Sequence, residues 1–136
     1  PVRQGATVVN NYPTIRISAL RLLSEIGTVS ALDDLVFVVR HDPDPYVRAE
    51  AVRAIGDLRF DPEGDGIESI YAAINGRYTG RESEMLAEAA LYTMEKLLFY
   101  YGCFTSDRGY DIVLHIFRGS YSRRIRERAL ALIHSM

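Results

Sequence analysis

The stretch from residue 61 to residue 69, DPEGDGIES, spaces acidic side chains as a calcium-binding loop does. Asp61, Glu63 and Asp65 fall at the first, third and fifth positions of such a loop, where carboxylate oxygens could bind Ca²⁺. An EF-hand loop also needs a bidentate glutamate at its twelfth position, where this chain has Ala72. We therefore predict no metal site here and interpret the stretch as an acidic turn that caps the next helix.

The histidines and the single cysteine form no recognisable catalytic motif. None of His41, His115 and His134 belongs to an H-E-x-x-H pattern. Cys103 has no histidine or second cysteine close by in the sequence to activate it, so we expect a partly buried, unreactive thiol. A single cysteine excludes an intrachain disulfide and indicates no particular compartment. The sequence therefore predicts no catalytic residue, no bound metal and no cofactor.

The overall composition is that of one globular domain. The chain has 136 residues, of which 48% are apolar, and a formal net charge of −2. This charge gives no general attraction for nucleic acids or anionic membranes. No apolar run approaches the roughly 20 residues that a membrane-spanning helix needs. Because the chain starts at Pro1 and stops within a helical pattern at Met136, we expect a fragment of a longer protein.

One pattern of apolar residues occurs four times along the chain. The copies are IRISALRLLSEI, VRAEAVRAIGDL, LAEAALYTMEKL and IRERALALIHSM, which begin at residues 15, 47, 86 and 125. In each copy an aliphatic residue is followed by alanine four positions later, then by apolar residues that complete one stripe of an α-helix. A second amphipathic stretch follows each of the first three copies, at 30–41, 66–77 and 107–118.

These stretches predict an all-α fold of antiparallel helix pairs in one domain, 1–136. The repeats span about 12–41, 44–78 and 79–118, with a partial repeat at 122–136, after an extended segment at 1–11. Each pair buries too little surface alone and must stack on its neighbours. Asp44 and Pro45 have the types preferred at the N-cap and first position of a helix. Three other pairs have the spacing of a capping box: Ser30 with Asp33, Asp65 with Glu68, and Thr79 with Glu82.

The run DPDPYVRAEAVRAIG, at 42–56, closely resembles the HEAT repeat, in particular the phycobilin-lyase-type HEAT-like repeat. The resemblance covers nearly all of the chain from about residue 12 onward and implies a right-handed α-solenoid. In this family, the arginine after the aliphatic residue typically pairs with an aspartate or the backbone of the preceding turn, forming a ladder along the stack. That role maps to Arg16, Arg48 and Arg126, with Asp42 as the acid matched to the second repeat. The third repeat has Ala87 instead, so the ladder is expected to break there.

The resemblance implies that the second helices of the pairs line a concave face. Aromatic residues flanked by charges are common anchors of protein interfaces, and the outward positions of these helices carry both. Acids lie near the helix starts and arginines near the helix ends, as the helix dipole prefers. The outward positions are Asp33, Phe37 and Arg40; Glu68, Ala72 and Asn75; and Asp111, His115 and Arg118; Val36, Tyr71 and Leu114 form an adjacent column. We expect a non-catalytic scaffold that binds a partner protein or peptide there.

Two other functions are alternatives to the protein-binding scaffold. Five arginines at 118–128 could bind nucleic-acid phosphates, although nucleic acid is not the expected partner because the remaining surface is acidic. An enzyme-associated domain related to the phycobilin lyases is a further alternative. An iron-dependent hydroxylase branch of the fold carries His-Glu pairs, but this chain has Ala49-Glu50 and Ser18-Ala19 at the corresponding places. Leu130 and Ile133 lack a following helix, so a further repeat or a second copy of the chain is expected to cover them.

Overall fold

The fold class is all-α, as predicted. The computed structural model describes residues 13–26, 29–76 and 78–136, so the segment predicted to be extended, 1–11, lies outside the described residues. The described residues contain no β-strand. Within them the helices are α1 (Pro13–Ile26), α2 (Val29–His41), α3 (Pro45–Leu58), α4 (Asp65–Ile74), α5 (Gly80–Tyr101), α6 (Arg108–Arg118) and α7 (Arg123–Ser135).

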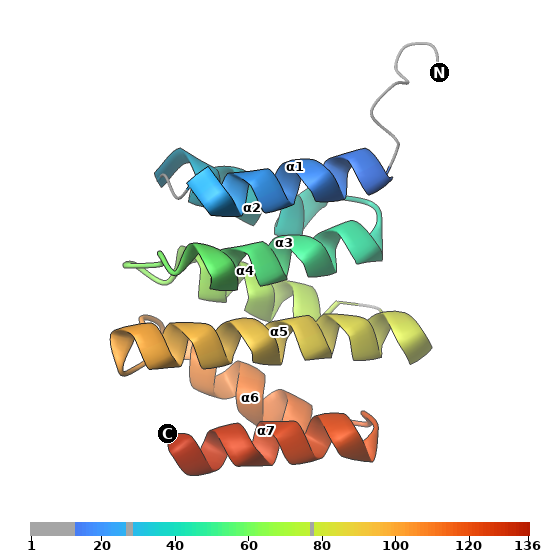
Figure 1. The fold of residues 1–136 in the computed structure, drawn as a ribbon. Helices are drawn as coiled ribbons and strands as arrows, with labels where there is room; N and C mark the ends of the chain where they lie inside the picture. The colour runs from blue at the N-terminus through green and yellow to red at the C-terminus, as the bar shows by residue number, and fades with distance from the viewer. Residues whose placement is uncertain (1–12, 27–28, 77) are drawn as a thin grey trace.

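The helices form two layers. The odd-numbered helices lie side by side in chain order, and the even-numbered helices form a second layer behind them (Figure 1). Each helix runs opposite to the next one along the chain, so all even-numbered helices point in the same direction (Figure 1). The helix α3 packs against α1, α2 and α5, and α4 packs against α2, α5 and α6. Every helix therefore contacts only its near neighbours along the stack.

The first repeated apolar position and its alanine are buried in every odd-numbered helix that follows another odd-numbered helix. Val47, Leu86 and Ile125 are buried, and so are the alanines at positions 51, 90 and 129. Burial of these alanines lets neighbouring helices approach closely, because a larger side chain would overfill the space between them. In α1 the equivalent Ile15 is 61% exposed and Ala19 is also exposed. The reason is that no odd-numbered helix precedes α1 among the described residues, whereas α3 packs against α1, α5 against α3 and α7 against α5.

The even-numbered helices show the same contrast. Leu35, Ile70 and Val113 are buried at one repeated position. Tyr110 and Phe117 of α6, which align with the buried Ile67 and Ile74 of α4 in the repeat, are instead exposed. No further even-numbered helix follows α6 in the described part of the chain, so these rings have one uncovered side.

Two of the helix starts are fixed by buried or capping aspartates. Asp44 has an extended backbone (φ −93°), and its side chain accepts a hydrogen bond of 2.8 Å from the amide of Tyr46. This confirms the predicted N-cap of α3, a contact that typically stabilises a helix by about 1 kcal/mol. At the start of α4, the buried Asp61 accepts hydrogen bonds from the amides of Gly66 (2.8 Å) and Ile67 (3.0 Å). The acidic turn therefore caps α4, as we expected.

The three predicted capping boxes are wrong. Ser30 lies inside α2, which already includes Val29, so it is not at the N-cap position. Thr79 precedes α5 but makes no capping hydrogen bond with its side chain. The N-cap residue of α4 is Gly64, and Asp61 rather than Asp65 accepts the bonds from the first amides. Spacing alone did not distinguish these arrangements because the caps depend on where each turn closes.

Arginine side chains of α1, α3 and α7 contact the turn or helix end that follows or precedes their repeat, whereas α5 has Ala87 at the equivalent position. Arg16 of α1 donates to Asp42 over 3.0 Å and 3.2 Å, so Asp42 binds the arginine of the first repeat and not Arg48. The reason is that α2 runs back along α1 and brings its last turn beside the first turn of α1. Arg48 donates to the carbonyl of Val39 over 2.7 Å, and Arg126 donates to the carbonyl of Tyr121 over 3.1 Å.

Candidate functional site

A pocket of about 540 Å³ lies on the even-numbered layer, between α4 and α6. Its lining residues are Tyr71, Asp111, Leu114, His115, Arg118 and Gly119. Tyr71 comes from α4, whereas the others come from α6 and the residue that ends it. Four of the residues singled out from the sequence, Tyr71, Asp111, His115 and Arg118, are therefore brought together around one hollow with a partly apolar floor.

The ring of Tyr71 is held by a residue that the sequence analysis did not identify. The guanidinium carbon of Arg108 lies 4.4 Å from the ring centroid, which is the geometry of a cation–π contact. Arg108 also lies 3.4 Å from the carboxylate of Asp111 and 4.0 Å from that of Glu68. Glu68 in turn accepts a hydrogen bond of 2.5 Å from Ser106. Arg108 therefore lies between the Tyr71 ring and two carboxylates, and its single positive charge is shared between Glu68 and Asp111.

The remaining predicted residues lie outside this pocket. Phe37 of α2 is 64% exposed, and its ring centroid is 4.7 Å from that of His41. Asp33 and Arg40 of the same helix are also exposed, Asp33 after the first turn and Arg40 in the last turn. Asn75 follows α4, where its side-chain amide donates to the carbonyl of Tyr71 over 2.9 Å. The helix α4 therefore separates the α2 residues from the α6 residues.

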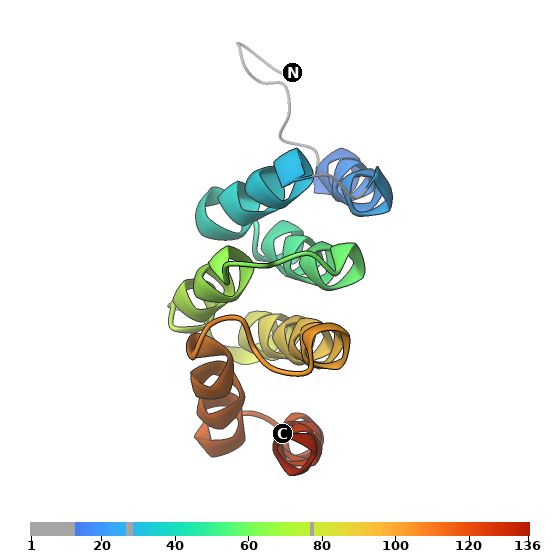
Figure 2. The ribbon, with the colours of Figure 1, turned by 90° about the vertical axis from the view of Figure 1, so that its left-hand side faces the viewer.

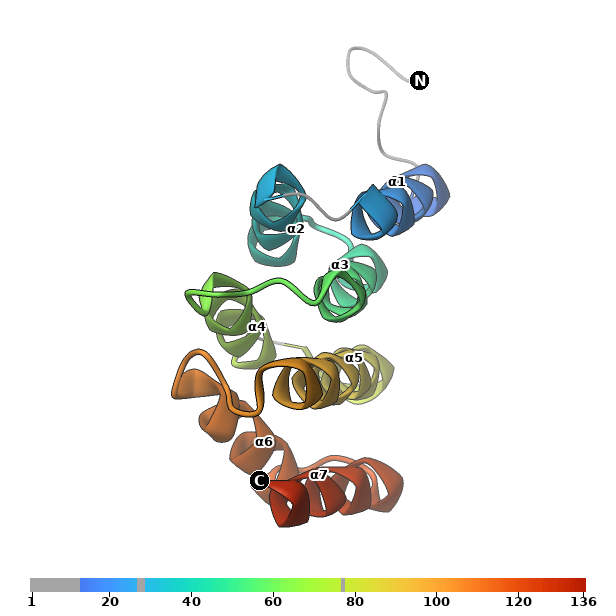
Figure 3. The same ribbon diagram turned by 60° about the vertical axis from the view of Figure 1, so that its left-hand side comes forward.

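The even-numbered layer lies on the outer side of a shallow curve. In Figures 2 and 3 the helices α3 and α5 lie on the even-numbered side of a line drawn from α1 to α7. The expectation that the outward positions of α2, α4 and α6 form the concave face is therefore wrong. The concave side belongs to the outer face of α1, α3, α5 and α7.

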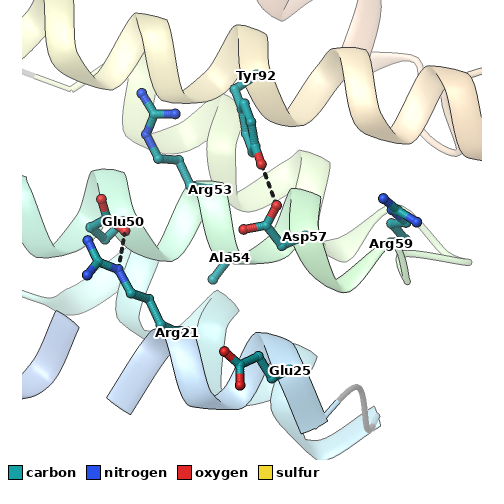
Figure 4. A pocket seen from close by; sticks show the side chains of 8 residues that line it. All are labelled: Arg21, Glu25, Glu50, Arg53, Ala54, Asp57, Arg59 and Tyr92. Atoms are coloured by element: carbon teal, nitrogen blue, oxygen red, sulfur yellow. Dashed lines mark hydrogen bonds and ion pairs between the residues drawn. The ribbon is translucent and has the colours of Figure 1, made fainter. Parts of the chain in front are cut away.

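A second pocket, of about 600 Å³, lies on that concave side between α1, α3 and α5 (Figure 4). Charged residues from α1, α3 and the residue that ends α3 line it together with Tyr92 of α5, and an ion pair joins Arg21 to Glu50 across two helices (Figure 4). The N–O distance between Arg21 and Glu50 is 3.6 Å, and that between Arg53 and Glu88 is 3.7 Å. This pocket differs from the first one because two of its bases, Arg21 and Arg53, each lie close to a carboxylate of the next odd-numbered helix.

Tyr92 lies at the upper wall of the second pocket and acts as a hydrogen-bond donor there. Its hydroxyl donates to the carboxylate of Asp57 (Figure 4). This bond, together with burial and the nearby negative charge, raises the pKa of Tyr92 above its ordinary value. The guanidinium of Arg53 lies 5.1 Å from the ring centroid. Tyr92 therefore stays protonated and links α5 to α3, so it is not activated as a nucleophile.

The five arginines considered as a phosphate-binding cluster make separate contacts. Arg118 lines the pocket beside Tyr71, and Arg126 bonds to a backbone carbonyl. The other three pair with glutamates, with these closest N–O distances: Arg123 with Glu127, 2.9 Å; Arg124 with Glu88, 2.6 Å; and Arg128 with Glu95, 3.8 Å. The hydrogen bond from Arg124 lowers the pKa of Glu88. Carboxylates thus neutralise much of the positive charge that a phosphate backbone would need.

Three further expectations from the sequence concern metal binding, Cys103 and membrane-spanning helices. Among the described residues, no group of three or more histidine, cysteine, aspartate and glutamate side chains is arranged to hold a metal ion. Cys103 is exposed, and not partly buried as we expected, because it follows the left-handed Gly102 that ends α5 and lies in the open turn. Within the parts of the chain that the structure describes, no helix has the length and apolar character to cross a membrane.

The candidate site is thus an outward strip across α2, α4 and α6, with one pocket beside Tyr71.

Comparison of the chain with models of protein families, with curated proteins and with solved structures gave no match. The resemblance to HEAT repeats therefore stays a prediction that depends on the residues themselves.

Proposed function

We propose that the chain is a HEAT-like, right-handed α-solenoid that acts as a non-catalytic scaffold for protein interactions. The two-layer order of the helices and the repeated buried alanines support the repeat assignment. Contacts from Arg48 and Arg126 to carbonyls of the preceding segment agree with the ladder that the family resemblance implies. Stacked helix pairs of this kind present extended surfaces, which suit the binding of a partner segment.

The binding surface in this proposal is the outward strip, defined as Asp33, Phe37, Arg40, Glu68, Tyr71, Asn75, Asp111, His115 and Arg118. The observation that carries it is the pocket beside Tyr71, where an aromatic ring and the apolar Leu114 are flanked by charged groups. Interfaces are enriched in such aromatic anchors and in arginine. The concave face is the less suitable surface because most of its charged groups already pair with one another across the helices.

Selection from a random peptide library displayed on phage tests this function. We expect the selected peptides to bind the parent chain and to lose about tenfold or more in affinity on Tyr71→Ala, because removal of the ring opens the wall of the pocket. Tyr92→Phe on the concave face is the matched control, since it changes an aromatic residue without altering the strip. Fluorescence anisotropy with synthetic copies of the selected peptides measures the affinities.

Two results would contradict the proposal. Peptides that bind Tyr71→Ala as tightly as the parent would place the interface elsewhere, and peptides that lose affinity only on Tyr92→Phe would place it on the concave side. Circular dichroism of each variant establishes that the helices are intact. Bound metal or cofactor in the purified chain, detected by elemental analysis and absorbance, would instead favour the enzyme-associated alternative.

The C-terminal end of the stack supports self-association as a second candidate interaction. Phe99 is 92% exposed, and a groove of about 340 Å³ beside it is lined by residues that include Leu98, Tyr110, Leu132 and Met136. Exposed apolar surface of this kind commonly marks an interface. We expect the average sedimentation coefficient of the parent to rise with concentration and that of Phe99→Asp to stay constant. A parent that remains monomeric at all concentrations would remove this candidate.

A further inference from the structure

Charge on the outward strip is separated along the helix axes. Because α2, α4 and α6 point in the same direction, their first turns lie along one edge of the strip and their last turns along the other (Figure 1). The last turns carry Arg40 in α2 and His115 with Arg118 in α6. Asp111 lies in the first turn of α6 and Glu68 in that of α4. The strip therefore has an acidic edge and a basic edge.

The two edges differ in how far their charges are already paired. On the acidic edge, Arg108 lies within 4.0 Å of both Glu68 and Asp111. On the basic edge, no carboxylate of the described residues lies within ion-pair distance of Arg40 or Arg118. The unpaired charge of the basic edge is therefore positive, and the acidic groups of a ligand that lies along this edge complement it.

The spacing of the helices defines how far apart the acidic groups of such a ligand must be. Packed helices lie about 8–10 Å apart, so α2 and α6, on either side of α4, are separated by about 16–20 Å. An extended peptide rises about 3.3 Å per residue and covers this distance in about five or six residues. A helical ligand, at about 1.5 Å per residue, would need roughly twice as many.

The middle of the strip favours an extended ligand with an apolar residue at its centre. The pocket beside Tyr71 and Leu114 lies between α4 and α6, next to Arg118, and offers space for one apolar side chain. The amide group of Asn75 bonds through its nitrogen to the carbonyl of Tyr71, which leaves its oxygen able to accept from a peptide N–H. Extended peptides present such unpaired backbone groups, whereas a helix keeps them internally bonded.

We propose that the strip binds an extended acidic segment in which two carboxylate side chains about six residues apart contact Arg40 and Arg118, with an apolar side chain between them in the Tyr71 pocket. This proposal rests on the protein-interaction function given above and adds the chemistry and spacing of the partner. The partner is thus defined by an acid–apolar–acid pattern and by its direction across the helices.

Synthetic fluorescein-labelled peptides test the spacing directly. One peptide carries two glutamates six positions apart and a leucine midway, in a glycine and serine background. A second has the same composition but adjacent glutamates, and a third places the glutamates twelve positions apart in a helix-forming background. We expect the first peptide to bind at least fivefold more tightly than the other two at low salt, with affinity falling as salt is raised. Equal binding of the first two, or tighter binding of the helical peptide, would overturn the proposal.

Charge reversal tests the two arginines. Arg118→Glu should weaken the first peptide about fivefold or more, because one attraction is replaced by repulsion. A peptide with lysine in place of one glutamate should recover binding to Arg118→Glu, and lysine at the other glutamate should recover binding to Arg40→Glu. Arg81→Glu is the matched control. It makes the same charge change at an exposed position of α5, in the odd-numbered layer and away from the strip.

The outcomes separate this inference from the proposed function. If library-selected peptides depend on Tyr71 but lack paired acids, or bind Arg118→Glu as they bind the parent, the acidic partner is wrong and the interaction function stands. If neither designed nor selected peptides bind the parent chain, both proposals are wrong. Dependence on Tyr71 together with rescue by the lysine peptides supports both.

Discussion

Replacement of Ala51 by leucine is expected to lower the free energy of unfolding by about 1–3 kcal/mol. Ala51 is completely buried in α3, which packs against α1 on one side and α5 on the other. The added atoms of leucine would push a neighbouring helix away or force strained side-chain conformations. Urea denaturation followed by circular dichroism measures the change through the midpoint of unfolding.

Ala19→Leu provides the matched control, because Ala19 occupies the same repeated position in α1 but is exposed. We expect this change to alter the free energy of unfolding by no more than about 0.5 kcal/mol, as is usual for surface substitutions. The pair separates overpacking from any general effect of leucine in a helix. If both variants unfold at the same urea concentration as the parent, close approach of the helices at Ala51 is ruled out.

Asp61→Ala is expected to cost about 2 kcal/mol or more, because two hydrogen bonds at the start of α4 are lost. The amides of Gly66 and Ile67 would be left without their acceptor, and each unsatisfied buried donor typically costs about 1–3 kcal/mol. Release from the cost of burying a carboxylate offsets part of this loss. Glu63→Ala, which removes an exposed carboxylate from the same turn, should change stability by less than about 0.5 kcal/mol.

The same aspartate gives a pH dependence with a defined sign. Burial raises the pKa of Asp61, and the nearby charges of Asp65 and Glu68 add to this, although the hydrogen bonds from the two amides oppose it. The native state therefore binds this proton more tightly than the unfolded state does. Its contribution to stability is fully present below the unfolded pKa and is lost as the pH rises through the raised native pKa.

Asp61→Asn, which cannot titrate, isolates this contribution. As the pH is lowered from 7 toward 4, the parent should gain stability relative to Asp61→Asn, as measured by urea denaturation at each pH. A parent that instead loses stability relative to Asp61→Asn over this range would show that the carboxylate is stabilised in its charged form.

The periodic pattern predicted the buried face of each helix but not which helices have neighbours. Val47 and Ile15 are equivalent in the repeat, yet Val47 is buried and Ile15 is exposed. The same holds for Ile67, which is buried, and Tyr110, which is exposed. Residue type and spacing specify the side of a helix that is apolar, whereas burial also requires an adjacent helix. The sequence pattern therefore holds where neighbouring helices meet and fails on faces that no described helix covers, as at Ile15 of α1 and Tyr110 of α6.

The sequence predicted only the part of the candidate site that lies on one helix, because contacts between helices do not appear in local spacing. Asp111, His115 and Arg118 share one face of α6, and a helical period is enough to group them. The contact between Arg108 and Tyr71 joins two helices that are distant in the sequence, so no local spacing indicated it. The curvature of the stack was also not predictable, because it depends on small differences in packing between successive helices.

Packing that is restricted to near neighbours also determines how the molecule opens. The helix α1 contacts only α2 and α3, so it can detach without breaking any contact among α4, α5, α6 and α7. The helix α3 cannot detach in this way, since α1, α2 and α5 all pack against it. Amide hydrogens in α1 are thus expected to exchange with solvent through local fraying, and those in α3 and α5 only through opening of most of the stack.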